Sequence, residues 1–116
     1  MSENHAPVAV SPAGHTSNGA TIVALHGEID PLTATPLAER LDALTAHPNP
    51  DLVLDLRSVT FIDCAGLSVL CRARNRTLTQ QGRLRLVSDS PGFRHILCAT
   101  GLGGVFEVQS QLPRRL

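Results

Sequence analysis

The stretch VTFIDCAGL at residues 59–67 decides how the fold is interpreted. Its first four residues favour a β-strand, and this pattern stops abruptly at Asp63, where small residues lead into a helical pattern of leucines. Asp63 can accept hydrogen bonds from the free N–H groups of the new helix, and Gly66 can let another backbone come close. The stretch therefore predicts either an ordinary capped helix start or a recognition tip at the N-terminus of a helix.

Strand and helix patterns alternate on both sides of this stretch. Before it, a β-branched strand breaks at Asp30-Pro31, and Thr33 or Thr35 can cap the helix that follows. The expected strands lie at 21–29, 51–56, 59–62, 83–88 and 105–108, and the expected helices lie between residue 33 and the break at 47–50, at about 67–81, and at 91–101. The alternation predicts an α/β fold with a four- to five-stranded, mixed but mostly parallel sheet and three main helices.

The length of 116 residues fits a single domain. Periodic patterns occupy residues 20–109, which we expect to be that domain. Residues 1–19 are rich in small and polar residues, so a flexible N-terminal tail is expected there, with a short first strand possible near 6–11. Residues 110–116 hold a proline and two arginines, and we expect them to form a short C-terminal tail.

Composition and motifs exclude several classes of function. The ten cationic residues balance ten acidic ones, and the three aromatic residues are all Phe. Nucleic acid and anionic membranes are therefore poor candidates as partners. No signal peptide, membrane span, phosphate-binding loop or metalloprotease motif is present, and the cysteines have no zinc-site spacing. We expect a cytoplasmic binding protein with no catalytic residues, no metal and no cofactor.

At this point the sequence resembles a known family. FIDCAGL at 61–67 resembles the FxDSxGL signature of the STAS domains that act as anti-sigma factor antagonists, and residues 27–34, which hold GEID followed by TA, resemble the GELDxxTA segment of that family. LVSDSP at 86–91 and TGLGGVF at 100–106 resemble its later strand and third helix. Because the motifs occur in order across residues 20–108, the chain is identified as a member of this family, with the STAS fold.

The resemblance implies a regulatory role in bacterial transcription. Such proteins bind an anti-sigma factor, usually one with a histidine-kinase-like ATPase domain, and so free a sigma factor. The kinase switches them off by phosphorylating the serine that follows the motif aspartate. Here Cys64 occupies that position, so the usual serine switch is expected to be missing. The partner-binding residues that the resemblance implies are Asp30, Asp63, Cys64, Ala65, Gly66 and Leu67, helped by the exposed face of the 67–81 helix.

Other functions stay open at the level of sequence. The domain could be a STAS subunit of a lipid or anion transport complex. It could be a thiol-based redox switch protein that uses Cys64, since oxidation would add bulk and charge at the tip. It could also bind a small ligand or a nucleotide, and it could form a homodimer through an exposed strand edge.

Overall fold

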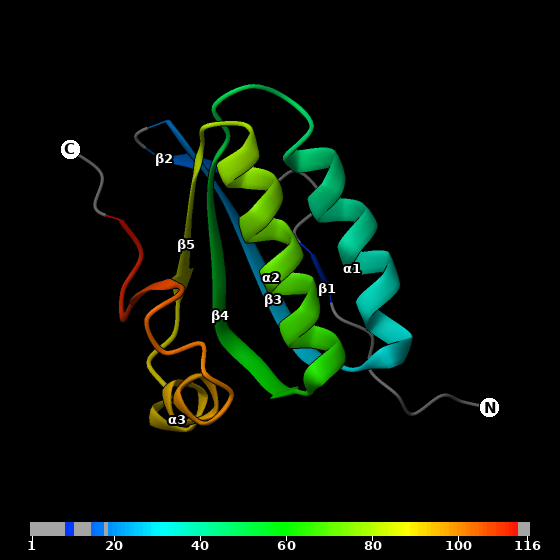
Figure 1. Ribbon diagram of the computed structural model, residues 1–116, viewed down its shortest axis with the longest axis vertical. Helices are drawn as coiled ribbons and strands as arrows, with labels where there is room; N and C mark the ends of the chain where they lie inside the picture. The colour runs from blue at the N-terminus through cyan, green and yellow to red at the C-terminus, as the bar shows by residue number, and fades with distance from the viewer. Residues whose placement is uncertain (1–8, 11–14, 18, 114–116) are drawn as a thin grey trace.

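One sheet with helices on one face organises the part of the chain that this computed structural model describes, residues 9–10, 15–17 and 19–113. The strands are β1 (Ala9–Val10), β2 (His15–Ser17), β3 (Ala20–Ile29), β4 (Asp51–Ile62), β5 (Arg83–Val87) and β6 (Glu107–Gln109). The helices are α1 (Pro31–Leu44), α2 (Cys64–Thr79) and α3 (Pro91–Ala99). Figure 1 shows α1 and α2 side by side in front of the sheet, and α3 at its lower end.

The sheet confirms the α/β class and the mostly parallel arrangement. Its order is β1-β3-β4-β5-β6, and β2 pairs with β3 outside this path. The strands from β3 to β6 are parallel, whereas β1 and β2 run antiparallel to β3. Among the described residues the sheet has six strands rather than four or five, because the expected N-terminal tail contributes two short strands. The remainder of that tail, residues 1–8, 11–14 and 18, lies outside the described residues.

The core lies between the sheet and α1 and α2. Alternation along β4 directs Leu52, Leu54 and Leu56 toward the helices, where all three are buried. Val53 points to the opposite face, in a smaller buried cluster against which Leu112 packs. The C-terminal segment is therefore attached to the sheet through Leu112, although the sequence predicted only a short tail there.

β4 extends beyond the end of β5 but stays paired with β3. The sequence predicted two separate strands at 51–56 and 59–62, but the structure has one continuous strand. β4 pairs with β5 only over residues 51–55, whereas its pairing with β3 continues to Ile62, with register shifts along the way. This extension carries the residues after Ile62 beyond the end of β5.

At the opposite end of the molecule, two turns are joined by hydrogen bonds. The Asn49 N–H donates to the Gln80 carbonyl at 2.8 Å, and the Arg83 N–H donates to the Pro50 carbonyl at 2.7 Å. The Asn49 side-chain amide donates to the Gln81 carbonyl at 3.1 Å. The turn after α1 is thus fixed to the turn after α2.

Gly82 is required at this junction because it has no side chain. It is not the residue in the left-handed conformation at the end of α2. That conformation belongs to Gln81, with a φ of 62°. The Gly82 N–H donates to the Thr77 carbonyl at 2.8 Å and the Gln81 N–H to the Leu78 carbonyl at 2.9 Å, the pattern of a Schellman motif. A Cβ on Gly82 would overlap the Pro50 carbonyl oxygen, so the close approach of the two turns requires glycine.

Candidate functional site

The starts of α1 and α2 lie next to each other at the carboxyl end of the sheet. Ile29 and Ile62 are register partners at the ends of β3 and β4. The Asp63 N–H donates to the Ile29 carbonyl at 3.2 Å. Asp30 and Asp63 follow these strand ends directly, and each caps the helix that it precedes. The structure therefore brings together the two aspartates that the sequence singled out.

The Asp30 carboxylate closes a complete capping box at the start of α1. Its Oδ1 accepts hydrogen bonds from the Leu32 N–H at 3.0 Å and the Thr33 N–H at 3.1 Å. In return, the Thr33 hydroxyl accepts from the Asp30 N–H at 2.9 Å and lies 2.9 Å from the Glu28 carbonyl, to which it can donate. The prediction that Thr33 or Thr35 caps this helix is wrong, because Asp30 is the cap and Thr33 is the third helical residue.

The Asp63 carboxylate makes a simpler cap at the start of α2. Its Oδ1 accepts a hydrogen bond from the Gly66 N–H at 3.1 Å, as the sequence predicted. The helix begins at Cys64, three residues before the leucine pattern suggested. Cys64 is therefore the first helical residue, and it is exposed, while Ala65 is half-buried.

Gly66 and Leu67 face the interior to different degrees. Gly66 is buried, and a Cβ there would lie 2.6 Å from Ile62 Cγ1 and 2.7 Å from Ile29 Cγ2. The close approach that this glycine permits is thus between α2 and the sheet, not toward a partner as the sequence suggested. Leu67 is only 7% exposed, yet it lines a hollow at the surface.

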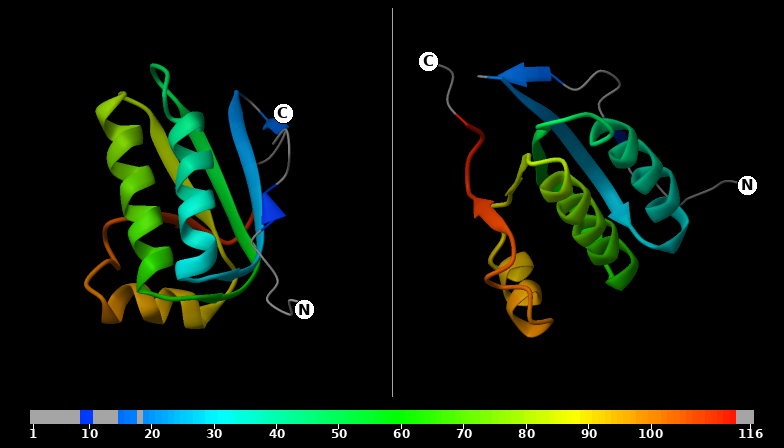
Figure 2. Two further views of the ribbon diagram at one scale, coloured as in Figure 1. Left: turned by 90° about the vertical axis from the view of Figure 1, so that its right-hand side faces the viewer. Right: turned by 45° about the horizontal axis from the view of Figure 1, so that its top comes forward.

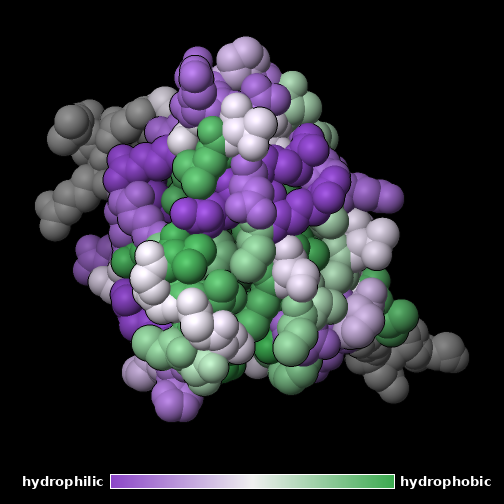
Figure 3. All heavy atoms as spheres, viewed as in Figure 1, coloured by the Kyte–Doolittle hydropathy of each residue, from purple (hydrophilic) through white to green (hydrophobic). Residues whose placement is uncertain are grey.

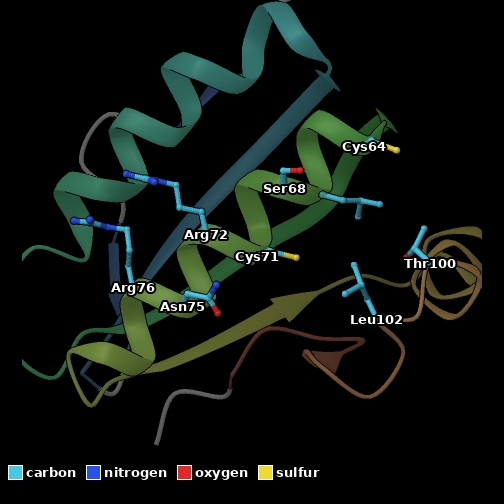
Figure 4. Close-up of a pocket in the computed structure, with 9 residues that line it drawn as sticks. Cys64, Ser68, Cys71, Arg72, Asn75, Arg76, Thr100 and Leu102 are labelled. Carbon is cyan, nitrogen blue, oxygen red and sulfur yellow. The ribbon is translucent and has the colours of Figure 1, made fainter.

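That hollow runs along α2 and has a volume of about 590 Å³. One wall is formed by α2, and the other by the segment that follows α3, as Figure 4 shows. Its lining residues are Cys64, Leu67, Ser68, Cys71, Arg72, Asn75, Arg76, Thr100 and Leu102. The sequence predicted a contribution from the exposed face of the 67–81 helix. It gave no signal for Thr100 and Leu102, because only the tertiary fold places the end of α3 opposite α2.

Two arginines of α2 share one carboxylate of α1. Arg72 Nε and Nη2 donate to the Asp42 oxygens at 3.0 and 2.8 Å. Arg76 Nε lies 3.2 Å from Asp42 Oδ1, and its Nη2 donates to the Asp42 backbone carbonyl at 3.1 Å. The hydrogen bond from Arg72, together with the positive charges of both arginines, holds the pKa of the Asp42 carboxyl below its ordinary value.

Comparison with known proteins assigns the chain to a family. The family model described as the STAS domain matches residues 11–113. This chain belongs to the STAS domain family. It is 30% identical over 105 residues to a curated protein named anti-sigma-F factor antagonist RsfB, from Mycobacterium tuberculosis, and this match covers 90% of the chain and 84% of the relative.

Solved structures agree with this assignment of the STAS domain. An anti-sigma factor antagonist from Mycobacterium paratuberculosis is 28% identical, with a TM-score of 0.78, and the match covers 97% of this chain and 92% of the other. A STAS domain protein from Planctomyces limnophilus has a TM-score of 0.73 at 21% identity, with 92% of each chain covered. Unphosphorylated SpoIIAA has a TM-score of 0.68 at 13% identity, covering 90% of this chain and 89% of the other. The last two show the shared fold.

Two exposed apolar side chains of the STAS domain were missed by the sequence analysis. Leu32, in the first turn of α1, is 73% exposed, and Phe61, near the end of β4, is 50% exposed. A signal existed for Leu32, because its helical phase places it opposite the buried Leu37 and Leu41. Both residues lie close in sequence to the two capping aspartates, so they add apolar surface at this end of the domain.

The cysteines of the STAS domain occupy different surroundings. Cys71 is half-buried and packs against the core, whereas Cys64 and Cys98 are exposed. In sequence, Cys98 lies on the apolar side of the helix expected at 91–101, which predicts that it fills the core; this prediction is wrong, because Cys98 is exposed. Within residues 9–10, 15–17 and 19–113, no three His, Cys, Asp or Glu side chains are grouped so that they could hold a metal ion. None of the helices described is long and apolar enough to cross a membrane.

Proposed function

We propose that this STAS domain is an anti-sigma factor antagonist that binds an anti-sigma factor and so frees a sigma factor for transcription. The observation that carries the proposal is the exposed Cys64 at the first position of α2, beside the adjoining start of α1. By resemblance, this is the position at which the family meets its partner. The names of the relatives from two mycobacteria support the same role.

The partner that we propose is an anti-sigma factor with a histidine-kinase-like ATPase domain. A phosphate on the first residue of α2 would add a charge of about −1.5 to −2 at the tip. Cys64 presents a thiol instead of the hydroxyl that a serine kinase phosphorylates, and Ala65 beside it has no acceptor group. The domain would therefore stay competent to bind, without the usual serine switch.

Binding, rather than catalysis, is the activity proposed for this site. Its side chains are two capping carboxylates, a thiol and small or apolar groups, and the described structure pairs none of them with a histidine as a catalytic base. The domain would act in the cytoplasm of a bacterium, where its partner controls transcription.

The test uses the purified domain and a kinase-like anti-sigma factor from the same organism. Wild type is expected to bind and to release the sigma factor, and Cys64→Asp is expected to bind at least about tenfold more weakly, because it places a fixed charge at the tip. With ATP, wild type is expected to remain unphosphorylated, whereas Cys64→Ser is expected to accept a phosphate. Failure of wild type to bind any such factor would overturn the proposal and favour a STAS subunit of a transport complex.

A thiol-based redox switch is a second candidate, favoured by the exposure of Cys64. Oxidation of the thiol to the sulfenic acid or beyond would change the size and charge of the tip. Treatment of the wild-type domain with hydrogen peroxide would then weaken binding, and Cys64→Ala would be insensitive. Equal sensitivity of both proteins would assign the effect to Cys71 or Cys98 and remove this candidate.

Light scattering of the domain alone would show whether it forms a homodimer.

A further inference from the structure

Helix α2 carries an excess of positive charge, although the whole chain has a net charge of zero. Between residues 64 and 79 there are three arginines, Arg72, Arg74 and Arg76, and no Asp or Glu. Asp42 of α1 is the carboxylate that pairs with Arg72 and Arg76. Arg74 Nε donates to a neutral group, the Val105 carbonyl, at 3.0 Å. Arg74 lies outside the hollow, so beside the hollow one carboxylate faces two guanidinium groups, which leaves a net positive charge.

Apolar groups lie beside these charges. Leu67, Cys71 and Leu102 line the hollow, and Figure 4 shows the Cys71 and Leu102 side chains on opposite sides of it, while Arg72 and Arg76 extend from α2 toward α1. In Figure 3, hydrophobic surface covers much of the lower part of this face, beneath a hydrophilic band. The face thus combines an apolar depression with a positively charged border.

We propose that the docking element of the partner is an acidic amphipathic segment that lies along α2. Its apolar side chains enter the hollow, and its carboxylates bind Arg72 and Arg76. This inference rests on the proposed function, and it names the chemistry of the partner surface. A guanidinium offers five N–H donors, and the Arg72 side chain is 55% exposed, so it can bind a second carboxylate while it contacts Asp42.

Under this proposal, Asp42 competes with the carboxylates of the partner for Arg72 and Arg76. It holds both arginines from within the domain, and it weakens the positive potential that an acidic segment meets. Removal of its charge should therefore tighten binding, a gain that misfolding of a variant could not produce. Ser68 lines the same hollow and is exposed, so a negative charge there should oppose the same segment.

The experiment measures the affinity of the same anti-sigma factor by calorimetry. We expect Arg72→Glu to weaken binding at least about tenfold and Ser68→Asp to weaken it several-fold, while Asp42→Asn tightens it about two- to fivefold. Arg94→Glu is the matched control, since it makes the same charge change at an exposed residue of α3 outside the hollow. Raising the salt concentration from 50 to 300 mM should weaken wild type more than Arg72→Glu.

Two results separate this inference from the proposed function. If wild type binds and Cys64→Asp does not, but Arg72→Glu equals Arg94→Glu and Asp42→Asn gains nothing, the acidic-segment inference is overturned and the proposed function stands. If wild type does not bind, the proposed function fails and the inference fails with it. Peptides that tile the anti-sigma factor give an independent check, because a binding peptide with net positive charge would also overturn the inference.

Discussion

The starts of α1 and α2 are built differently, although both helices follow neighbouring parallel strands and both are capped by an aspartate. In α1, the third helical residue is Thr33, whose hydroxyl accepts a hydrogen bond from the backbone of the capping residue. In α2, the third residue is Gly66, which has no side chain and packs against Ile29 and Ile62. Several hydrogen bonds within the first turn hold α1, whereas α2 combines one such bond, from the Gly66 N–H to Asp63, with contact with the sheet.

The difference bears on the binding role that we propose for the start of α2. The backbone of α2 is fixed from behind by the contact of Gly66 with the strand ends. The outward Cys64 is therefore held in place without making any of the capping hydrogen bonds that involve Asp63. A side chain fixed in this way can be exchanged without loss of the helix start, so Cys64→Ser and Cys64→Asp should both keep α2 intact.

The largest expected effect is that of Gly66→Val on stability. The added methyl groups would meet Ile29, which is fully buried, at distances well below van der Waals contact. We expect a loss of about 3 kcal/mol in the free energy of unfolding, measured by urea denaturation. Gly92→Ala is the matched control, because its Cβ would meet only Ser90 Oγ, at an ordinary 3.5 Å. A loss below about 1 kcal/mol for Gly66→Val would show that contact with the sheet does not hold α2.

The next effect compares the two caps directly. Asp30→Ala removes two hydrogen bonds to helical N–H groups, and Asp63→Ala removes one. We expect losses of about 2 and about 1 kcal/mol respectively, again from urea denaturation. A larger loss for Asp63→Ala than for Asp30→Ala would contradict the view that α1 depends more on its cap than α2 does.

A smaller effect concerns the ion pair that joins the helices away from their starts. The pKa of Asp42 is lowered in the folded protein by its hydrogen bond to Arg72 and by the charges of Arg72 and Arg76. Because the folded pKa lies below the ordinary value of 3.8, this stabilisation is fully present above that pH and is lost as the pH falls through the folded pKa. The difference in urea midpoint between wild type and Asp42→Asn should therefore be small at pH 7 and should disappear in stronger acid. If the difference in urea midpoint grew on acidification, the ion pair of Asp42 with Arg72 and Arg76 would not be its source.

The smallest effect is expected for Leu32→Ser in the first turn of α1. Leu32 is 73% exposed, so its replacement should change the free energy of unfolding by less than about 0.5 kcal/mol. Thermal unfolding would check this value. A larger loss would mean that the start of α1 depends on apolar contact as well as on its capping box.

Local signals allowed the sequence to predict much of the fold. Asp63 is a helix cap as expected, because a capping side chain bonds to N–H groups only a few residues away. Asp30, Asp63 and Cys64 were singled out through the resemblance to the family motifs, and the structure brings them to one end of the sheet. Where the local signals competed, as between Asp30 and Thr33 for the cap of α1, the choice was wrong.

The features that the sequence could not predict depend on tertiary contacts. The helical pattern assigned Cys98 to the core, but its side chain is exposed. Gly66 was expected to face a partner, and it instead faces Ile29 and Ile62, which come from separate strands. The hollow along α2 needs Thr100 and Leu102, whose position relative to α2 is set by the path of the chain after α3.

The two joined turns at the far end of the molecule decide where the chain can be altered. Residues 49–50 and 80–83 hold each other through backbone hydrogen bonds, and the contact of Gly82 with Pro50 leaves no room for an added atom. An insertion or a fused tag there would shift β4 against β5 and disturb the pairing of β5 with β6. At the opposite end the exposed Cys64 is free of such a restriction, although Gly66 two residues later is confined by Ile29 and Ile62. New binding specificities can therefore be engineered at one end while the other end keeps the strands in register.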